Sequence, residues 1–294
     1  MSQDPFGARL LSEITCRLQA AGIGEARLEA QLLAAHALGV SRAAVLAGSY
    51  GEPGAGRLAE IERWVSERER RVPFAYLRGD QEFYGLSFEV GPGVLVPRPE
   101  TELLVDFALE RLRDLGPDRT PLIVDVGTGS GCIAIATLAS FPAARAVATD
   151  LSPIAARFAR RNAVRLGVKD RLRIVRCDLA SAVRTGSADL VLSNPPYIPD
   201  DDIAGLQPEV RDFEPRLALA GGGDGLDTIR RLLIDAFRIL REGGWLAVET
   251  GIGQAKAVAT LMEEHCDVEI RPDLANIERV VCAKQTGSDL PAHE

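Results

Sequence analysis

The sequence predicts an α/β fold with a doubly wound, mostly parallel seven-stranded sheet, a small all-helical N-terminal domain and a linking β-hairpin. The length of 294 residues suits one full α/β domain with a smaller companion. Beyond residue 100, short apolar strand patterns alternate with helical ones almost to the end of the chain. A glycine-rich turn joins the first of these strands to its helix, which is typical of a ligand-binding sheet.

Helical spacing dominates residues 1–72, which we expect to form the N-terminal domain. Apolar residues recur at this spacing between Leu28 and Leu38, and Gly39 is a typical helix end. A second helix is predicted from Leu58 to Arg71. Its glutamates and arginines alternate in sign, so we interpret them as a solvated helix face and not as a nucleic-acid patch.

Aromatic and β-branched residues interrupted by glycines characterise residues 73–99, which predicts a β-hairpin linker between two domains. A helix from Thr101 to Leu115 then opens the second domain, predicted at residues 100–286. Residues 287–294 have the composition of a flexible tail.

The predicted strands of the second domain are short and apolar, and helices separate them near Cys132, Ile154, Leu226 and Gly253. In a parallel sheet with right-handed crossovers, ligands bind at the carboxyl ends of the strands. The predicted strands are Leu122–Val126, Ala144–Thr149, Leu172–Val175, Leu190–Ser193, Trp245–Glu249, Cys266–Ile270 and Arg279–Cys282.

Composition argues against several classes of protein. No segment approaches the roughly 20 apolar residues of a membrane span, and no targeting segment is visible at the start, so we expect a cytoplasmic protein. The 5 cysteines form no C-x-x-C pair and only 3 histidines are present, so we expect no metal site. A net charge of -8 favours a protein or small-molecule substrate over bare nucleic acid.

The segment Asp125-Val126-Gly127-Thr128-Gly129-Ser130-Gly131 lies between a predicted buried strand and a helix. Glycines there let a ligand approach the backbone, and the helix N-terminus attracts a carboxylate or phosphate. The spacing G-x-G-x-G after an acidic residue resembles class I methyltransferases, and favours S-adenosylmethionine over a dinucleotide, whose usual pattern is G-x-G-x-x-G. The candidate cofactor contacts in this loop are Asp125, Gly127, Thr128, Gly129, Ser130 and Gly131.

Two further strand ends carry aspartates suited to the rest of the cofactor. Asp150, with Leu151 beside it, follows the glycines by about twenty residues, where a carboxylate can accept hydrogen bonds from ribose hydroxyls. The run from Asp150 to Pro153 also has the pattern of a helix N-cap, and both roles are compatible. Asp178 is placed to bind the adenine amino group and Leu179 to pack on the ring, while a surface-loop aspartate explains Asp178 nearly as well.

Asn194-Pro195-Pro196-Tyr197, at the end of the fourth predicted strand, indicates which group is methylated. The lone pair of a planar NH2 group is delocalised, so the group must be gripped and polarised before it attacks a methyl sulfonium. The Asn194 side-chain carbonyl and the Pro195 backbone carbonyl can each accept one N–H, the prolines stiffen the loop, and Tyr197 can stack on the planar group. We therefore expect Asn194 and Pro195 to be catalytic, all four residues to bind substrate, and Asn194 to border the cofactor.

Taken together, these motifs and several other runs resemble the release factor glutamine methyltransferases over nearly the full chain. The resemblance implies a class I methyltransferase-type fold that binds S-adenosylmethionine, forms S-adenosylhomocysteine, and recognises its substrate partly through the N-terminal domain. It also implies N5-methylation of the glutamine in the Gly-Gly-Gln motif of class I peptide chain release factors. The other resembling runs are Arg71–Leu77, Glu82–Leu86, Pro97–Glu102, Asp212–Arg216, Gly221–Leu226, Glu249–Gly251 and Glu278–Val280.

The chain departs from the family pattern at two places. Leu179 and Ala180 stand where an aromatic residue is expected after the third-strand aspartate, so adenine packing there is looser or supplied by another residue. Asn276 stands where glycine is expected, and asparagine is the next residue most tolerant of a left-handed backbone.

Other functions remain open at this point. A sister enzyme would use Asn194 to Tyr197 on a ribosomal-protein glutamine, and an adenine methyltransferase would use them on a flipped base. The Pro97–Glu102 run favours the release factor, and the acidic composition counts against nucleic acid. A nicotinamide-dependent oxidoreductase would need the other glycine spacing, and a noncatalytic cofactor-binding module would not need Asn194.

Overall fold

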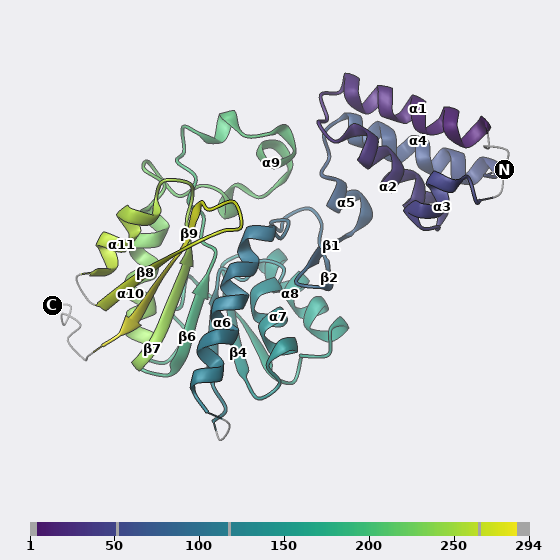
Figure 1. The fold of residues 1–294 in the computed structure, drawn as a ribbon. Helices are drawn as coiled ribbons and strands as arrows, with labels where there is room; N and C mark the ends of the chain where they lie inside the picture. The colour runs from purple at the N-terminus through teal and green to yellow at the C-terminus, as the bar shows by residue number, and fades with distance from the viewer. Residues whose placement is uncertain (1–4, 51–52, 117–118, 264–265, 287–294) are drawn as a thin grey trace. The chain divides into compact units, whose positions relative to one another are not determined.

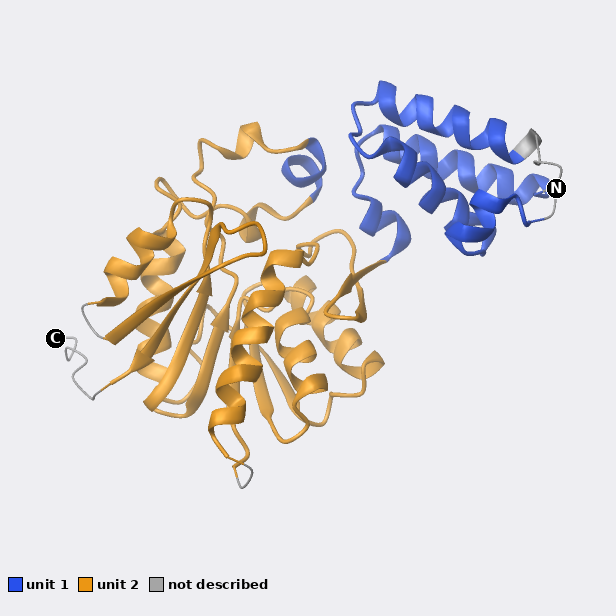
Figure 2. Cartoon of the chain, in the orientation of Figure 1, with its two compact units in different colours: residues 1–79, 208–213 blue, residues 80–207, 214–294 orange. Residues whose placement is uncertain are grey.

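A computed structural model describes residues 5–50, 53–116, 119–263 and 266–286 (Figure 1). Its contacts divide the chain into two compact units, of which the smaller holds residues 1–79 and 208–213 and the larger the remainder (Figure 2). From residue 80 onward, the region predicted as a linker therefore belongs to the larger unit. The tail predicted at 287–294 lies outside the described residues.

The smaller unit is helical and has its own apolar core. Leu18, Leu33 and Val65 from different helices are fully buried there. The ring of Trp64 stacks on that of His36, with 4.4 Å between the ring centroids. Its helices are α1 (Pro5–Ala20), α2 (Ala26–Leu38), α3 (Arg42–Ala47), α4 (Ala55–Glu69), α5 (Phe74–Arg78) and α9 (Pro208–Phe213).

Charged residues of α4 partly contradict the interpretation of that helix as a solvated face. Arg68 is only 4% exposed, and it pairs with Glu29 at 2.6 Å and with Glu209 of α9 at 2.7 Å. Arg71 pairs with the same Glu209 at 2.6 Å. The interpretation is wrong for Arg68 because its partners lie on other helices, and a buried guanidinium requires such partners.

The larger unit contains the predicted doubly wound sheet, with strand order β5-β4-β3-β6-β7-β9-β8. Neighbouring strands from β5 to β7 are parallel, whereas β9 is antiparallel to both β7 and β8. The strands are β3 (Leu122–Val126), β4 (Arg145–Asp150), β5 (Leu172–Arg176), β6 (Ala188–Ser193), β7 (Leu240–Glu249), β8 (Cys266–Pro272) and β9 (Glu278–Gln285).

Helices cover both faces of this sheet, because alternate strand residues point to opposite sides. Ile123 packs in one core with residues of α6, α7 and α8, while Val124 and Val126 pack in another with residues of α10 and α11. The helices are α6 (Glu102–Asp114), α7 (Cys132–Ser140), α8 (Pro153–Arg165), α10 (Asp227–Ile239) and α11 (Ala255–Glu263), and 3-10 turns span Pro99–Thr101, Ile203–Gly205 and Arg216–Ala218. No described helix has the length and apolarity that a membrane crossing demands.

The hairpin is shorter than the stretch predicted at 73–99. It consists of β1 (Asp80–Phe83) and β2 (Leu86–Glu89), while residues 74–78 form α5, which ends at Gly79 with a φ of +81°. Phe83 and Phe88 of the hairpin are buried in the core of the larger unit. The left-handed backbone expected at Asn276 is confirmed by its φ of +60°.

A buried asparagine joins this hairpin to the glycine-rich loop. Asn162 of α8 accepts a hydrogen bond from the Glu89 N–H at 2.7 Å, and its Nδ2 donates to the carbonyls of Glu89 at 3.0 Å and Ser130 at 2.8 Å. Its side chain is fully buried, so each of these backbone groups depends on it for pairing. Nothing in the local sequence pattern predicted this role.

Replacing Asn162 with leucine should lower the free energy of unfolding by about 2–4 kcal/mol, because buried backbone groups lose their partner. Urea denaturation followed by circular dichroism measures the change. Val164, on the same helix but 62% exposed, is the control, since Val164→Ala should change stability by less than about 0.5 kcal/mol. Equal effects of the two substitutions would contradict the connecting role of Asn162.

Candidate active site

The register of the central strands brings the predicted site residues together. Val126 of β3 pairs with Thr149 of β4 on one side and with Ser193 of β6 on the other. Gly127, Asp150 and Asn194 follow these three residues directly, so the three strand ends lie side by side. They border a pocket of about 220 Å³ at the point where the strand order reverses, the usual ligand position in such a sheet.

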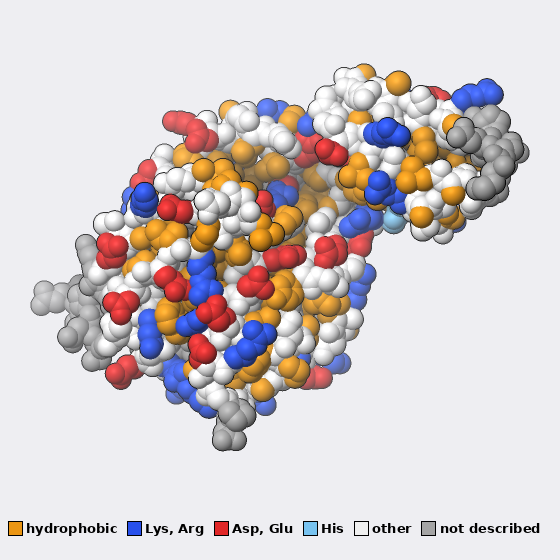
Figure 3. Space-filling view, in the orientation of Figure 1, with side chains coloured by type: hydrophobic (Ala, Val, Ile, Leu, Met, Phe, Trp, Pro, Cys, Tyr) orange, Lys and Arg blue, Asp and Glu red, His pale blue; other side chains and the backbone are white. Residues whose placement is uncertain are grey.

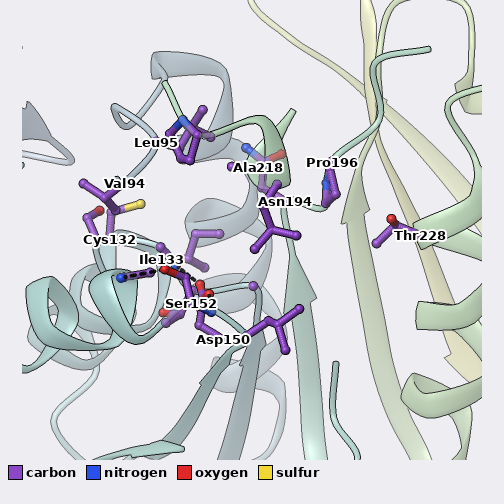
Figure 4. A pocket seen from close by; sticks show the side chains of 18 of the residues that line it. Val94, Leu95, Cys132, Ile133, Asp150, Ser152, Asn194, Pro196, Ala218 and Thr228 are labelled. Atoms are coloured by element: carbon purple, nitrogen blue, oxygen red, sulfur yellow. Dashed lines mark hydrogen bonds between the residues drawn. The ribbon is translucent and has the colours of Figure 1, made fainter. Parts of the chain in front are cut away.

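Most residues predicted to bind cofactor or substrate line this pocket. Asp125, Gly131, Pro195 and Tyr197 are not among the lining residues. Figure 4 shows Asn194 and Pro196 at the end of one strand, with Asp150 and Ser152 across the pocket from them. The predicted residues that line it are Gly127, Thr128, Gly129, Ser130, Asp150, Leu151, Asp178, Leu179, Asn194 and Pro196.

Glycine is required in the loop for both conformation and space. Gly127, Gly129 and Gly131 have φ values of +74°, +57° and +86°. A Cβ on Gly131 would lie 2.8 Å from the Ile135 side chain and 3.2 Å from the Cβ of Ala159, so Gly131 permits α7 and α8 to pack closely. Helix α7 also starts without a side-chain cap, which suits a bound carboxylate.

Asp125 stabilises this loop through buried hydrogen bonds. It is fully buried, and one carboxylate oxygen accepts hydrogen bonds from the Thr128 hydroxyl at 2.6 Å and the Ala134 N–H at 3.2 Å. Burial raises the pKa of Asp125 to about 6. These contacts give Asp125 a part in shaping the glycine-rich loop, whereas its direct contact with the cofactor stays a prediction.

Asp150 lies at the pocket wall with its carboxylate held in place. Oδ2 accepts the Gly129 N–H at 2.9 Å, and Oδ1 accepts the Ser152 N–H at 2.8 Å. The N-cap of α8 is Ser152, whose hydroxyl accepts the Ala155 N–H at 3.2 Å. Burial raises the pKa of Asp150. Each oxygen retains a lone pair, so the carboxylate is available to ribose hydroxyls.

The loop after β5 has an unusual backbone. Leu179 has a φ of +44°, which is strained for a side chain of this kind. The next residue, Ala180, is fully buried, and its N–H donates to Asp235 at 3.0 Å. Asp178 pairs with Arg231 of α10 at 2.5 Å, and both line the pocket. The guanidinium of Arg231 therefore lies beside Asp178 at the wall of the pocket.

Asn194 extends from the end of β6 into a hydrogen-bonded group of side chains. Its Nδ2 donates to the Thr101 hydroxyl at 2.9 Å. Tyr197 turns its hydroxyl toward Glu249 at 3.4 Å, and its backbone carbonyl accepts from the Gln254 side chain at 2.9 Å. Burial raises the pKa of Tyr197, so its phenol stays neutral. The expected stacking of Tyr197 on substrate stays a prediction.

The remaining pocket wall comes from segments to which the sequence motifs assign no role. Glu214 connects two of these segments, because its carboxylate accepts a hydrogen bond from the Val96 N–H at 3.2 Å and forms an ion pair with Arg98 at 2.5 Å. Burial raises the pKa of Glu214. The signal for this wall was the resemblance of Pro97–Glu102 and Asp212–Arg216 to the family. The additional lining residues are Gly93, Val94, Leu95, Pro97, Arg98, Thr101, Cys132, Ile133, Ser152, Ala155, Pro215, Leu217, Ala218, Ala220, Thr228 and Arg231.

S-adenosylmethionine fits this set of residues by chemistry. A carboxylate suits the ribose, apolar side chains suit the adenine, and the uncapped start of α7 suits the methionine carboxylate. Within the described parts of the chain, no three His, Cys, Asp or Glu side chains are grouped so as to hold a metal ion.

Comparisons with known proteins show what this chain resembles. A family model described as the PrmC N-terminal domain matches residues 9–79, and one described as the methyltransferase small domain matches residues 101–205. Proteins named release factor glutamine methyltransferase are similar over most of the chain. That of Bradyrhizobium diazoefficiens is 42% identical over 96% of this chain and 97% of its own. That of Cereibacter sphaeroides is 43% identical over 91% and 94%.

Solved structures support the fold. The human METTL16 catalytic domain in complex with an RNA hairpin of MAT2A has a TM-score of 0.55 and 15% identity, covering 71% of this chain and 79% of that one. The N-terminal domain of human METTL16 in complex with SAH has a TM-score of 0.50 and 18% identity, covering 70% and 77%. At these identities the similarity concerns the fold alone.

Replacing Asp150 with alanine should weaken S-adenosylmethionine binding by about 1–3 kcal/mol, because the ribose hydroxyls lose an acceptor and the Gly129 N–H loses its partner. Isothermal titration calorimetry measures the affinity. Asp170→Ala, in an exposed position away from the pocket, should leave the affinity unchanged. Equal affinity of the wild-type and Asp150→Ala proteins would remove Asp150 from the binding site.

Proposed function

Because the chain belongs to the family of release factor glutamine methyltransferases, we propose that it methylates a glutamine of peptide chain release factors. The methyl group comes from S-adenosylmethionine, and the acceptor is the side-chain amide nitrogen (N5) of the Gly-Gly-Gln glutamine. The observation that carries this proposal is the register of β6 on β3, which puts Asn194 directly beside the start of the glycine loop. Asn194, the residue proposed to bind the glutamine amide, thus lies at the wall of the cofactor pocket.

In the proposed reaction, the protein orients a poor nucleophile. The side-chain carbonyl of Asn194 and the backbone carbonyl of Pro195 each accept one N–H of the glutamine amide, which directs the nitrogen toward the cofactor. S-adenosylmethionine, when bound, supplies an electrophilic methyl group on a sulfonium. The new N–C bond forms as the S–C bond breaks, and one amide proton passes to water. The accepting carbonyls stabilise the positive charge that develops on the nitrogen.

We assign the cofactor contacts to the carboxyl ends of β3, β4 and β5. Gly127 to Gly131 surround the methionine part, Asp150 with Leu151 binds the ribose, and Asp178 with Leu179 binds the adenine. Asp125 supports the loop through Thr128. The assignment follows the sequence order of the family motifs, and all of these residues except Asp125 and Gly131 line one pocket.

Other methyl acceptors are distinguished by one assay. The protein and labelled S-adenosylmethionine are incubated in separate reactions with a release factor, with ribosomal proteins, and with DNA or RNA. We expect label in the release factor, and none when its Gly-Gly-Gln glutamine is replaced by alanine. Figure 3 shows acidic and basic side chains interspersed over the visible face, which does not favour a nucleic-acid acceptor. Label confined to a nucleic acid or a ribosomal protein would overturn the proposal.

We also propose that the helical unit helps to recognise the protein substrate. A protein acceptor offers more surface than a single glutamine, and the match of residues 9–79 to a family-specific domain supports a family-specific role. The cofactor pocket, by contrast, is lined entirely by residues of the larger unit.

Asn194→Ala should reduce the rate of release factor methylation by about a hundredfold or more, the scale expected for one lost preorganised acceptor. S-adenosylmethionine affinity should stay close to wild type, because binding rests mainly on other strand ends. Single-turnover assays and calorimetry measure the two quantities. Unchanged turnover would disprove the role of Asn194.

A chain that begins at Asp80 should lose most release factor methylation while retaining S-adenosylmethionine affinity, since the pocket residues are all present. Cooperative thermal unfolding with cofactor-induced stabilisation is the control for a folded protein. Full methylation by this shorter chain would contradict the proposed recognition role of the helical unit.

A further inference from the structure

Behind Asn194, a buried threonine and a buried glutamate form a chain of hydrogen bonds with it. The Thr101 hydroxyl accepts from Asn194 Nδ2 at 2.9 Å and donates to Glu249 Oε2 at 2.6 Å. Thr101 and Glu249 are each 2% exposed. They belong to segments far apart in sequence, and both segments resemble the family without a role in the assigned site.

The Thr101 hydroxyl bonds to distant side chains and not to the backbone of the helix that follows it. Thr101 is the last residue of the 3-10 turn that runs into α6, and its side chain makes no cap hydrogen bond. Its hydroxyl is instead fully engaged by Asn194 and Glu249. Glu249 lies at the end of β7, where the pairing of Ser193 with Val248 puts it beside Asn194.

From this arrangement we propose that Thr101 and Glu249 are positioning residues that fix which end of the Asn194 amide faces the substrate. The inference rests on the proposed function. A carboxylate can only accept hydrogen bonds, so it takes the Thr101 proton, and the oxygen of Thr101 must then accept from Asn194. Asn194 therefore turns Nδ2 toward Thr101, which leaves Oδ1 to accept from the glutamine NH2.

The opposite protonation state removes this control. A neutral Glu249 carries a proton that it can donate to Thr101, whose hydroxyl is then free to donate to Oδ1 of a flipped Asn194 amide. The flipped amide presents Nδ2 to the substrate, and two N–H donors then face each other. Methyl transfer consequently requires the ionised form of Glu249.

The surroundings of Glu249 put this change near neutral pH. Burial raises the pKa of Glu249 to about 7. The hydrogen bonds from Thr101 and Tyr197 act in the opposite direction and lower this pKa. Of the nearby charges, Glu100 raises the pKa of Glu249 and Arg279 lowers it. Cys132 also faces the carboxylate, but burial raises its pKa to about 12, and the buried phenol of Tyr197 stays neutral as well. The carboxylate form thus predominates above about pH 7 and is lost below it.

Substitution of Thr101 separates the hydroxyl from the shape of its side chain. Thr101→Val keeps the shape and should lower kcat by about ten- to a hundredfold at pH 8, with little change in S-adenosylmethionine affinity. Thr101→Ser restores the hydroxyl and should recover most of that loss. Thr137→Val is the matched control, because Thr137 is equally buried but its hydroxyl donates within α7 to the Ile133 carbonyl, and its rate should equal wild type.

A pH profile of kcat from pH 5.5 to 9 provides a readout that a purely structural role would not change. The wild-type rate should fall below about pH 7, and Glu249→Gln should have a low rate without this inflection. Equal kcat for Thr101→Val and wild type would overturn the proposal. An inflection that persists in Glu249→Gln would overturn it too. The two proposals fail in different ways. Failure of the wild-type protein to label any release factor would overturn the proposed function, whereas the Thr101 and Glu249 variants test the positioning role.

Discussion

The parallel pairing of β3 with β4 and with β6 is the constraint on which the rest of the site depends. Since Val126 pairs with both Thr149 and Ser193, the glycine loop, the Asp150 carboxylate and the Asn194 amide begin at the same level of the sheet. A shift of one residue in either pairing would turn alternate side chains to the other face and separate these groups. Ile123 on one face of β3 and Val124 on the other are packed in separate cores, so such a shift would disrupt both cores, and the core packing therefore determines the geometry of the site.

Much of this arrangement follows from the sequence because the signals are local. The alternation of strands and helices, the glycine spacing and the Asn194 to Tyr197 run each lie within one short segment, and together they predict the sheet and the ends of its strands. Gly39 and Asn276 likewise reveal their left-handed backbones through residue type alone.

The parts that sequence reasoning did not predict depend on partners far along the chain. Asn162 bonds the hairpin 73 residues away, Arg98 pairs with a glutamate 116 residues away, and Thr101 bonds one 148 residues away. No periodicity links such positions, so a buried polar residue is recognisable only when the fold has brought its partner close. Arg68 illustrates the same point, because its helix has the pattern of a solvated face while its guanidinium is buried among carboxylates of other helices.

The peptide bond between Asn194 and Pro195 has a bearing on chemical durability. Asparagine side chains deamidate when the backbone nitrogen of the following residue, after losing its proton, attacks the side-chain carbonyl to close a five-membered imide. Proline has no backbone N–H to lose, so this route is closed at Asn194. An aspartate there would place a negative charge at the wall of the pocket. Pro195 thus both stiffens the loop and protects Asn194 from deamidation through an imide.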